Sequence, residues 1–154
     1  MKPFTVNANS IDLDLNVLSA SERLVLWRYR QHATNGRLFG RSGAALTQSE
    51  AATRLGISGN TYARLEEGAA SAMSADKISG LLTALGPLFP SLGELCFIAR
   101  RRSGAKLQEV LDSFNRVSET ARREMISRPW FHQLERAGDP RVIAHWESQG
   151  FKFP

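Results

Sequence analysis

Cysteine and long apolar runs are both scarce in this 154-residue sequence, and their scarcity excludes several classes of protein. The single cysteine, Cys96, allows neither an intrachain disulfide nor a cysteine zinc cluster. No stretch of about 18 apolar residues occurs, so we expect no transmembrane helix. The N-terminus holds one lysine and lacks the apolar core of a secretion signal. We therefore expect a cytoplasmic protein with a buried structural thiol.

Patterns that carry enzyme chemistry are also missing. The sequence shows no nucleophile–base pair, no phosphate-cradling glycine loop and no strong metal motif. His132, Glu135 and His145 are the one set that suggests metal binding, but the two histidines fall on different predicted helices with the spacing of no strong site. We expect no enzyme activity, no metal site and no cofactor.

What the sequence does have is an excess of positive charge, formally +5. Residues 21–68 hold seven basic and four acidic side chains, and residues 97–128 hold eight and four. The remaining segments are near neutral or slightly acidic. A basic excess gathered in two segments favours an anionic partner.

Residues 47–68, TQSEAATRLGISGNTYARLEEG, have the pattern of two short helices joined by a tight turn. Thr47 and Glu50 predict a capping box at the start of the first helix. Gly56 is the glycine expected where that helix ends, and Ser58 is the expected N-cap of a second helix over Gly59–Glu67. This arrangement is typical of a helix laid in the DNA major groove.

The same stretch resembles the helix-turn-helix of the phage-repressor, or xenobiotic-response-element (XRE, Cro/C1-type), family of transcriptional regulators. The resemblance rests on Thr47, Gln48, Glu50, Ala52, Arg54, Leu55, Gly56, Ile57, Ser58, Thr61, Arg64, Leu65, Glu66 and Gly68. It continues into residues 73–95, which are similar to the two closing helices of that five-helix domain. It implies an all-α, repressor-like DNA-binding domain.

A recognition helix presents its N-terminal residues to base edges, which selects the candidate DNA contacts. Asn60 can pair bidentately with adenine, and Arg64 with guanine or a phosphate. Gln48 is expected to meet a phosphate at the start of the preceding helix. The complete predicted set is Gln48, Ser58, Gly59, Asn60, Thr61 and Arg64, with Arg37 and Arg41 added from a loop insertion over residues 34–45. That basic loop either touches phosphate or a minor groove, or is an ordinary solvated loop.

Four side chains near the motif have expected structural roles. Tyr62 is expected to pack in the core, with a phosphate contact through its hydroxyl as the alternative. Glu66 and Glu67 are expected to satisfy arginines within the fold. Arg28, on the helix that begins at Ser19, is expected to remain in solvent beside that helix's apolar face.

The sequence divides into an N-terminal arm (1–18), the DNA-binding domain (19–102) and a helical extension (103–154). In the arm, apolar residues alternate with polar ones over residues 11–17, which predicts a strand paired with another subunit or with residues 151–153, or an extended arm on the domain. The three arginines at 100–102 form either a solvated junction or a phosphate contact. The apolar stripe over Leu107–Met125 predicts either a dimer seam or packing within the chain.

The leading functional hypothesis is a sequence-specific, DNA-binding transcriptional regulator, a repressor that binds a palindromic operator as a homodimer. The alternative is an antitoxin-like interaction module whose C-terminal helices bind a protein partner while the motif autoregulates. Neither hypothesis involves a membrane.

Overall fold

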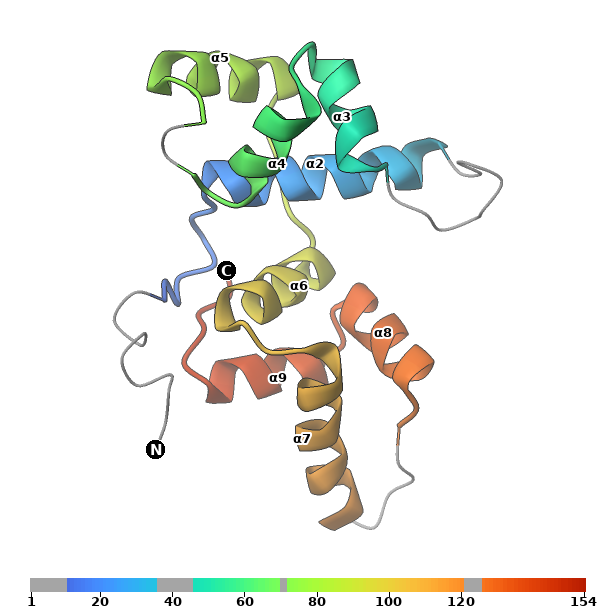
Figure 1. Ribbon diagram of the computed structural model, residues 1–154. Coiled ribbons are helices and arrows are strands. Elements are labelled where there is room, and N and C mark those ends of the chain that lie inside the picture. The colour runs from blue at the N-terminus through green and yellow to red at the C-terminus, as the bar shows by residue number, and fades with distance from the viewer. Residues whose placement is uncertain (1–10, 36–45, 70–71, 121–125) are drawn as a thin grey trace. The chain divides into compact units, whose positions relative to one another are not determined.

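The fold is all-α, as predicted, in every part of the chain that the structure describes. A computed structural model describes residues 11–35, 46–69, 72–120 and 126–154, which form eight helices and no strand (Figure 1). The chain divides into two compact units, Leu18–Phe89 and Met1–Val17 with Pro90–Pro154. We call them the α2–α5 unit and the α6–α9 unit. None of the described helices combines the length and apolar character needed to cross a membrane.

In the α2–α5 unit, a long helix supports three shorter ones. The helices are α2 (Ala20–Asn35), α3 (Gln48–Leu55), α4 (Gly59–Glu66) and α5 (Ala75–Leu85), and α3, α4 and α5 lie along one side of α2 (Figure 1). The core is formed by Leu24, Ala51, Ala52, Tyr62 and Leu65. From α5, Ile78, Leu81 and Leu85 pack against this core and are themselves partly buried.

The ends of α3 and α4 follow the predicted capping chemistry. Thr47 and Glu50 form the capping box, and Ser58 accepts a hydrogen bond from the backbone N–H of Thr61. Gly56 has a φ of 74°, a left-handed conformation that is strained for any residue with a Cβ. The motif therefore has sharp ends at both helices, and the turn of residues 56–58 fixes how they meet. Helix α2 continues to Asn35, so the predicted insertion begins two residues later than expected, and Arg37 and Arg41 lie outside the described residues.

The α6–α9 unit has its own core. Its helices are α6 (Leu92–Ser103), α7 (Leu107–Thr120), α8 (Arg128–Ala137) and α9 (Pro140–Ser148). The largest fully buried side chains of this unit are Leu15, Leu95, Cys96, Ile98, Phe131 and Val142. The backbones of α6 and α8 approach so closely that a Cβ added to Gly93 would lie 1.9 Å from the carbonyl oxygen of Arg136. Glycine is required there by space.

The sequence placed α6 in the DNA-binding domain, and the structure places it in the other unit. Helix α6 packs against α8 and α9. The spacing of apolar residues in a sequence indicates an amphipathic helix, but it does not show which helices cover the apolar face. On α7, Val110, Leu111 and Phe114 are buried within the chain. The described part of the Leu107–Met125 stripe is therefore an intramolecular contact.

The N-terminal segment pairs with the C-terminus, one of the partners expected from its alternating pattern. Asp14 and Lys152 form a parallel bridge, with Leu15 N donating to Lys152 O (3.0 Å) and Lys152 N donating to Leu13 O (2.7 Å). Leu15 is buried as the pattern predicts, whereas Val17 is exposed. The Arg102 guanidinium donates to the carbonyls of residues 12, 14 and 17, so this arginine of the 100–102 run holds the segment in place.

Candidate nucleic-acid interface

Helix α4 has a sharply divided surface. Asn60 and Arg64 are exposed and lie four residues apart, so they share one outward stripe, which Glu67 extends by one turn. Gly59 and Thr61 are half-buried beside that stripe. The structure thus brings together the four predicted base-reading positions at and just after the N-terminus of one capped helix.

The cap of α4 also fixes the direction of one hydroxyl. Ser58 Oγ accepts from the Thr61 backbone and donates to Thr61 Oγ1 at 2.8 Å. The Thr61 hydroxyl therefore keeps its own proton available for an outside acceptor such as a phosphate oxygen. Ser58 is occupied as a cap, and it contributes to the interface through this orientation.

The inward side of α4 is held by Tyr62. Its ring is fully buried in the core and its hydroxyl donates to the carbonyl of Leu24 at 3.2 Å. Burial raises the pKa of Tyr62 far above its ordinary value of 10. The core role expected for Tyr62 is confirmed, and the alternative phosphate contact is excluded because the hydroxyl faces inward.

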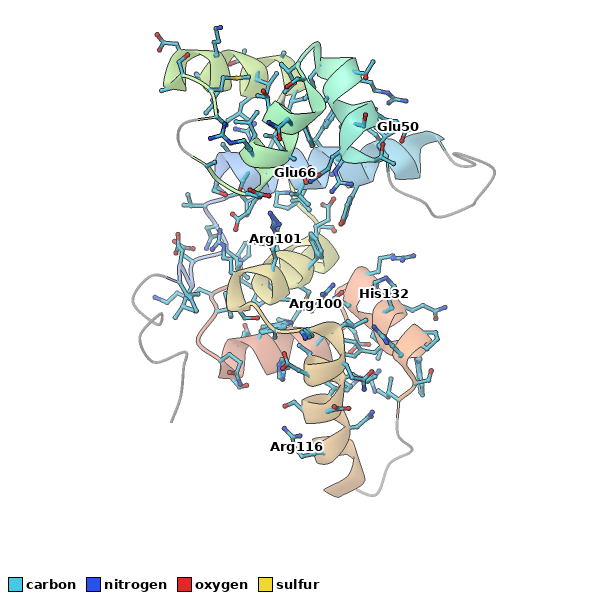
Figure 2. All side chains as sticks on the ribbon, viewed as in Figure 1. Glu50, Glu66, Arg100, Arg101, Arg116 and His132 are labelled. Carbon is cyan, nitrogen blue, oxygen red and sulfur yellow. The ribbon has the colours of Figure 1, made fainter. Side chains whose placement is uncertain are left out.

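A buried carboxylate ties α2, α3 and α4 together. Glu66, which is labelled in Figure 2, accepts from Arg28 through both oxygens, at 2.8 and 3.0 Å, and from the Gln48 side-chain amide at 2.8 Å. Arg28 also donates to the carbonyl of Leu46, just before α3, at 2.7 Å. Burial by itself would raise the pKa of Glu66, but the hydrogen bonds from Arg28 and Gln48 outweigh it, and the pKa is lowered. The role expected for Glu66 is confirmed, whereas Glu67 is exposed on the outward side of α4.

Two expectations about this network are corrected. Arg28 does not remain in solvent, since its side chain is 13% exposed and paired. The missed signal is its position four residues after the buried Leu24, which places both on the core face of α2. Gln48 was expected to present its side chain to a phosphate, but its amide nitrogen is committed to Glu66. In the first turn of α3, the side chain of Ser49 is exposed.

Most other basic side chains of the α2–α5 unit also make contacts within it. Arg23 donates to Gly86 O and Arg30 to Phe89 O. Arg54, which is exposed on α3, donates to the side chain of Gln31 at 2.6 Å. Among the described residues, the positive charge on the outer surface of α3 and α4 therefore comes from Arg54 and Arg64, accompanied by the acidic Glu67.

The polar groups of the α6–α9 unit are arranged for packing. Glu135 is buried and accepts two hydrogen bonds from Arg100, at 2.8 and 3.2 Å, while His132 Nδ1 lies 4.0 Å from the same carboxylate. No set of three histidine, cysteine or acidic side chains in the described ranges is placed to hold a metal ion. The thiol of Cys96 is buried, which raises its pKa to about 12 and leaves it unreactive at neutral pH.

Comparison of the chain with protein-family models, with curated proteins and with solved structures gives no match. The features that indicate a function are therefore the geometry of α3 and α4 and the chemistry of their exposed side chains.

Proposed function

We propose that the protein is a sequence-specific DNA-binding transcriptional regulator that inserts α4 into the major groove. The observation that carries this proposal is the exposed pair Asn60 and Arg64 on a capped helix whose opposite face is anchored by Tyr62 and Glu66. An α-helix with its side chains is about 10–12 Å across, which matches the width of the B-DNA major groove, about 12 Å.

The two exposed side chains suit base reading. The Asn60 amide offers one donor and one acceptor, the pair that matches adenine N7 and N6, and the Arg64 guanidinium can donate twice to guanine. Because α4 is clamped to α2 and α3, these groups are presented without the cost of ordering a loop. Gly59 leaves the first position of the helix without a side chain, so discrimination falls on Asn60 and Arg64.

The proposed mode of action is that of a repressor in the XRE family. Two copies bind a palindromic operator and occlude RNA polymerase, with two α4 helices about one turn of DNA apart. The described part of the apolar stripe on α7 does not form the proposed dimer contact, because Val110, Leu111 and Phe114 are buried within the chain.

The test is selection from a random duplex library with purified protein at near-physiological salt. The proposal expects a palindrome with half-sites about 10 base pairs apart. It also expects Asn60→Ala to relax discrimination at one base pair of each half-site, by about 1–3 kcal/mol, with the fold intact by circular dichroism.

Gln108→Ala is the matched control, because it removes an exposed amide from α7 and should leave the selected motif unchanged. Recovery of no motif, with binding that disappears as salt rises, would leave only nonspecific phosphate attraction. The antitoxin-like alternative would then lead, and co-purification of the chain with a small protein partner would support it.

A further inference from the structure

The exposed surface of α8 carries an arginine near each end and a histidine between them. Arg128, His132 and Arg136 are exposed and follow one another at intervals of four residues, which places them in a stripe along the helix (His132 is labelled in Figure 2). At 1.5 Å per residue, the two arginines are separated by about 12 Å along the helix axis. Neither arginine has an ion pair with another described residue.

Negative charge is removed from this surface by the fold. Glu135 is the only acidic residue of α8, and it is 3% exposed and bound by Arg100 from α6. The arginine of α6 therefore neutralises the one carboxylate that would otherwise offset the stripe. The exposed face of α8 is left with basic and uncharged side chains.

Helix stability does not account for Arg128. It occupies the first turn of α8, which holds no acidic residue, and a cation there opposes the positive end of the helix dipole. Arg136, in the last turn, is favourably placed for the dipole, so only Arg128 is locally unfavourable. A cation at that position becomes favourable when an anion binds to it.

The surfaces of the neighbouring helices differ. The exposed residues of α7 include Glu109 and Asp112, and Arg141 on α9 is paired with Asp139 at 3.0 Å. In the α2–α5 unit, Arg23, Arg28 and Arg30 are engaged within the fold. Among the described residues, α8 therefore offers a polyanion a row of basic side chains with no exposed acidic residue on the same helix.

We propose that this stripe, Arg128, His132 and Arg136, is a second DNA-contact surface that binds backbone phosphates of the duplex outside the base pairs read by α4. The proposal rests on the proposed function, which supplies duplex DNA as the polyanion. Each DNA strand carries one phosphate per about 3.4 Å, so a stripe about 12 Å long spans three to four phosphates. Phosphate contacts of this kind add affinity and carry no sequence information.

The experiment compares the full-length protein with the double variant Arg128→Gln/Arg136→Gln on two duplexes, one with the selected motif and one with it scrambled. Dissociation constants are measured from 50 to 200 mM salt. The loss of two phosphate contacts should make the fall of log K, the association constant, with log salt less steep, reducing the magnitude of the slope by about 2. It should also weaken binding at 0.15 M salt by about 30-fold on both duplexes. The motif recovered by selection should not change.

Two control variants make the result specific to α8. Arg128→Lys/Arg136→Lys keeps both charges and should retain most of the salt slope, because counterion release depends on charge. Lys77→Gln/Lys106→Gln removes two exposed charges from other positions and should leave the slope close to that of the unaltered protein. All variants alter exposed side chains, and circular dichroism checks that each is folded.

An unchanged salt slope in Arg128→Gln/Arg136→Gln would overturn the proposal that the α8 stripe contacts DNA. An equal fall in the Lys77→Gln/Lys106→Gln control would also overturn it, because net charge alone would then explain the effect. If the α8 variant lost binding to polyglutamate while its DNA slope stayed the same, the surface would belong to an acidic protein partner instead. Failure of the proposed function has a different signature, since the unaltered protein would then select no motif at all.

Discussion

Glu66→Gln tests whether α3 and α4 are held together by one buried charge. The Glu66 carboxylate is 4% exposed and accepts hydrogen bonds from Arg28 and Gln48. Glutamine has nearly the same volume, so the change opens no cavity, but its NH2 group cannot accept the hydrogen bonds that one carboxylate oxygen accepts now. Arg28 would then be a partly buried cation without a counter-charge. Removing one partner of a fully buried pair costs about 3–5 kcal/mol, and because Arg28 is partly exposed we expect a loss near the lower end of that range.

The same carboxylate makes the stability of the α2–α5 unit depend on pH. The pKa of Glu66 is lowered in the folded protein from an ordinary value of 4.5. Its stabilising contribution is therefore complete above about pH 4.5, and it is lost as the pH falls through the folded-state pKa. We expect the unfolding free energy of the unit to fall below pH 4.5 in the unaltered protein, and to fall less steeply in Glu66→Gln.

Amide hydrogen exchange under native conditions is the appropriate assay, because it reports the opening free energy of each unit separately. Protected amides of α4 should exchange faster in Glu66→Gln, while those of α8 should be unaffected. Glu67→Gln is the matched control, since Glu67 is the exposed neighbour and its loss should cost less than about 0.5 kcal/mol. Equal effects of the two substitutions, or an equal change in α8, would refute the reasoning.

Two further predictions concern the α6–α9 unit, one about the close approach of two helices and one about hydrogen bonds to the N-terminal segment. Gly93→Ala should destabilise the α6–α9 unit by about 3 kcal/mol or more, because the added Cβ would overlap the backbone oxygen of Arg136. Gly80→Ala, at a position on α5 with open space around it, should instead stabilise the protein by up to about 1 kcal/mol. Thermal unfolding would measure both variants, and a Gly93→Ala variant as stable as the unaltered protein would contradict the close approach of α6 and α8. Arg102→Ala removes three hydrogen bonds to the backbone of residues 12–17. We therefore expect hydrogen exchange at the Lys152 amide, which donates to Leu13 O, to accelerate at least about tenfold. An unchanged exchange rate would show that the pairing of Asp14 with Lys152 does not depend on Arg102.

Local chemistry was predictable from the sequence at the starts of α3 and α4. Thr47 and Ser58 cap the helices that their positions predicted, since a capping hydroxyl and the backbone N–H it satisfies lie within three residues of each other. The division of α4 into an exposed stripe and a buried face was predictable for the same reason, because one helical period determines both.

Long-range partners were not predictable in this way. The assignment of α6 to the second unit depends on Gly93 meeting Arg136, residues 43 positions apart with no pattern that links them. The network of Glu66, Arg28 and Gln48 likewise joins three helices, and a single sequence does not show which basic residue a buried acid will meet. The N-terminal alternation did indicate an extended segment, although it left open the partner that the structure identifies as Lys152.

A basic composition overstates the charge that is free to meet DNA. Of the side chains that produce the formal +5, Arg28 and Arg100 neutralise buried carboxylates and Arg102 is committed to backbone carbonyls. Salt-dependent affinity depends on exposed charge near phosphate and not on the total. Under the proposed function, α4 therefore reads bases with few phosphate contacts from its own surface, and a second cationic surface is needed to supply affinity. The stripe on α8 has the exposure, the sign and the length for that role, so specificity and affinity are assigned to different units of the chain.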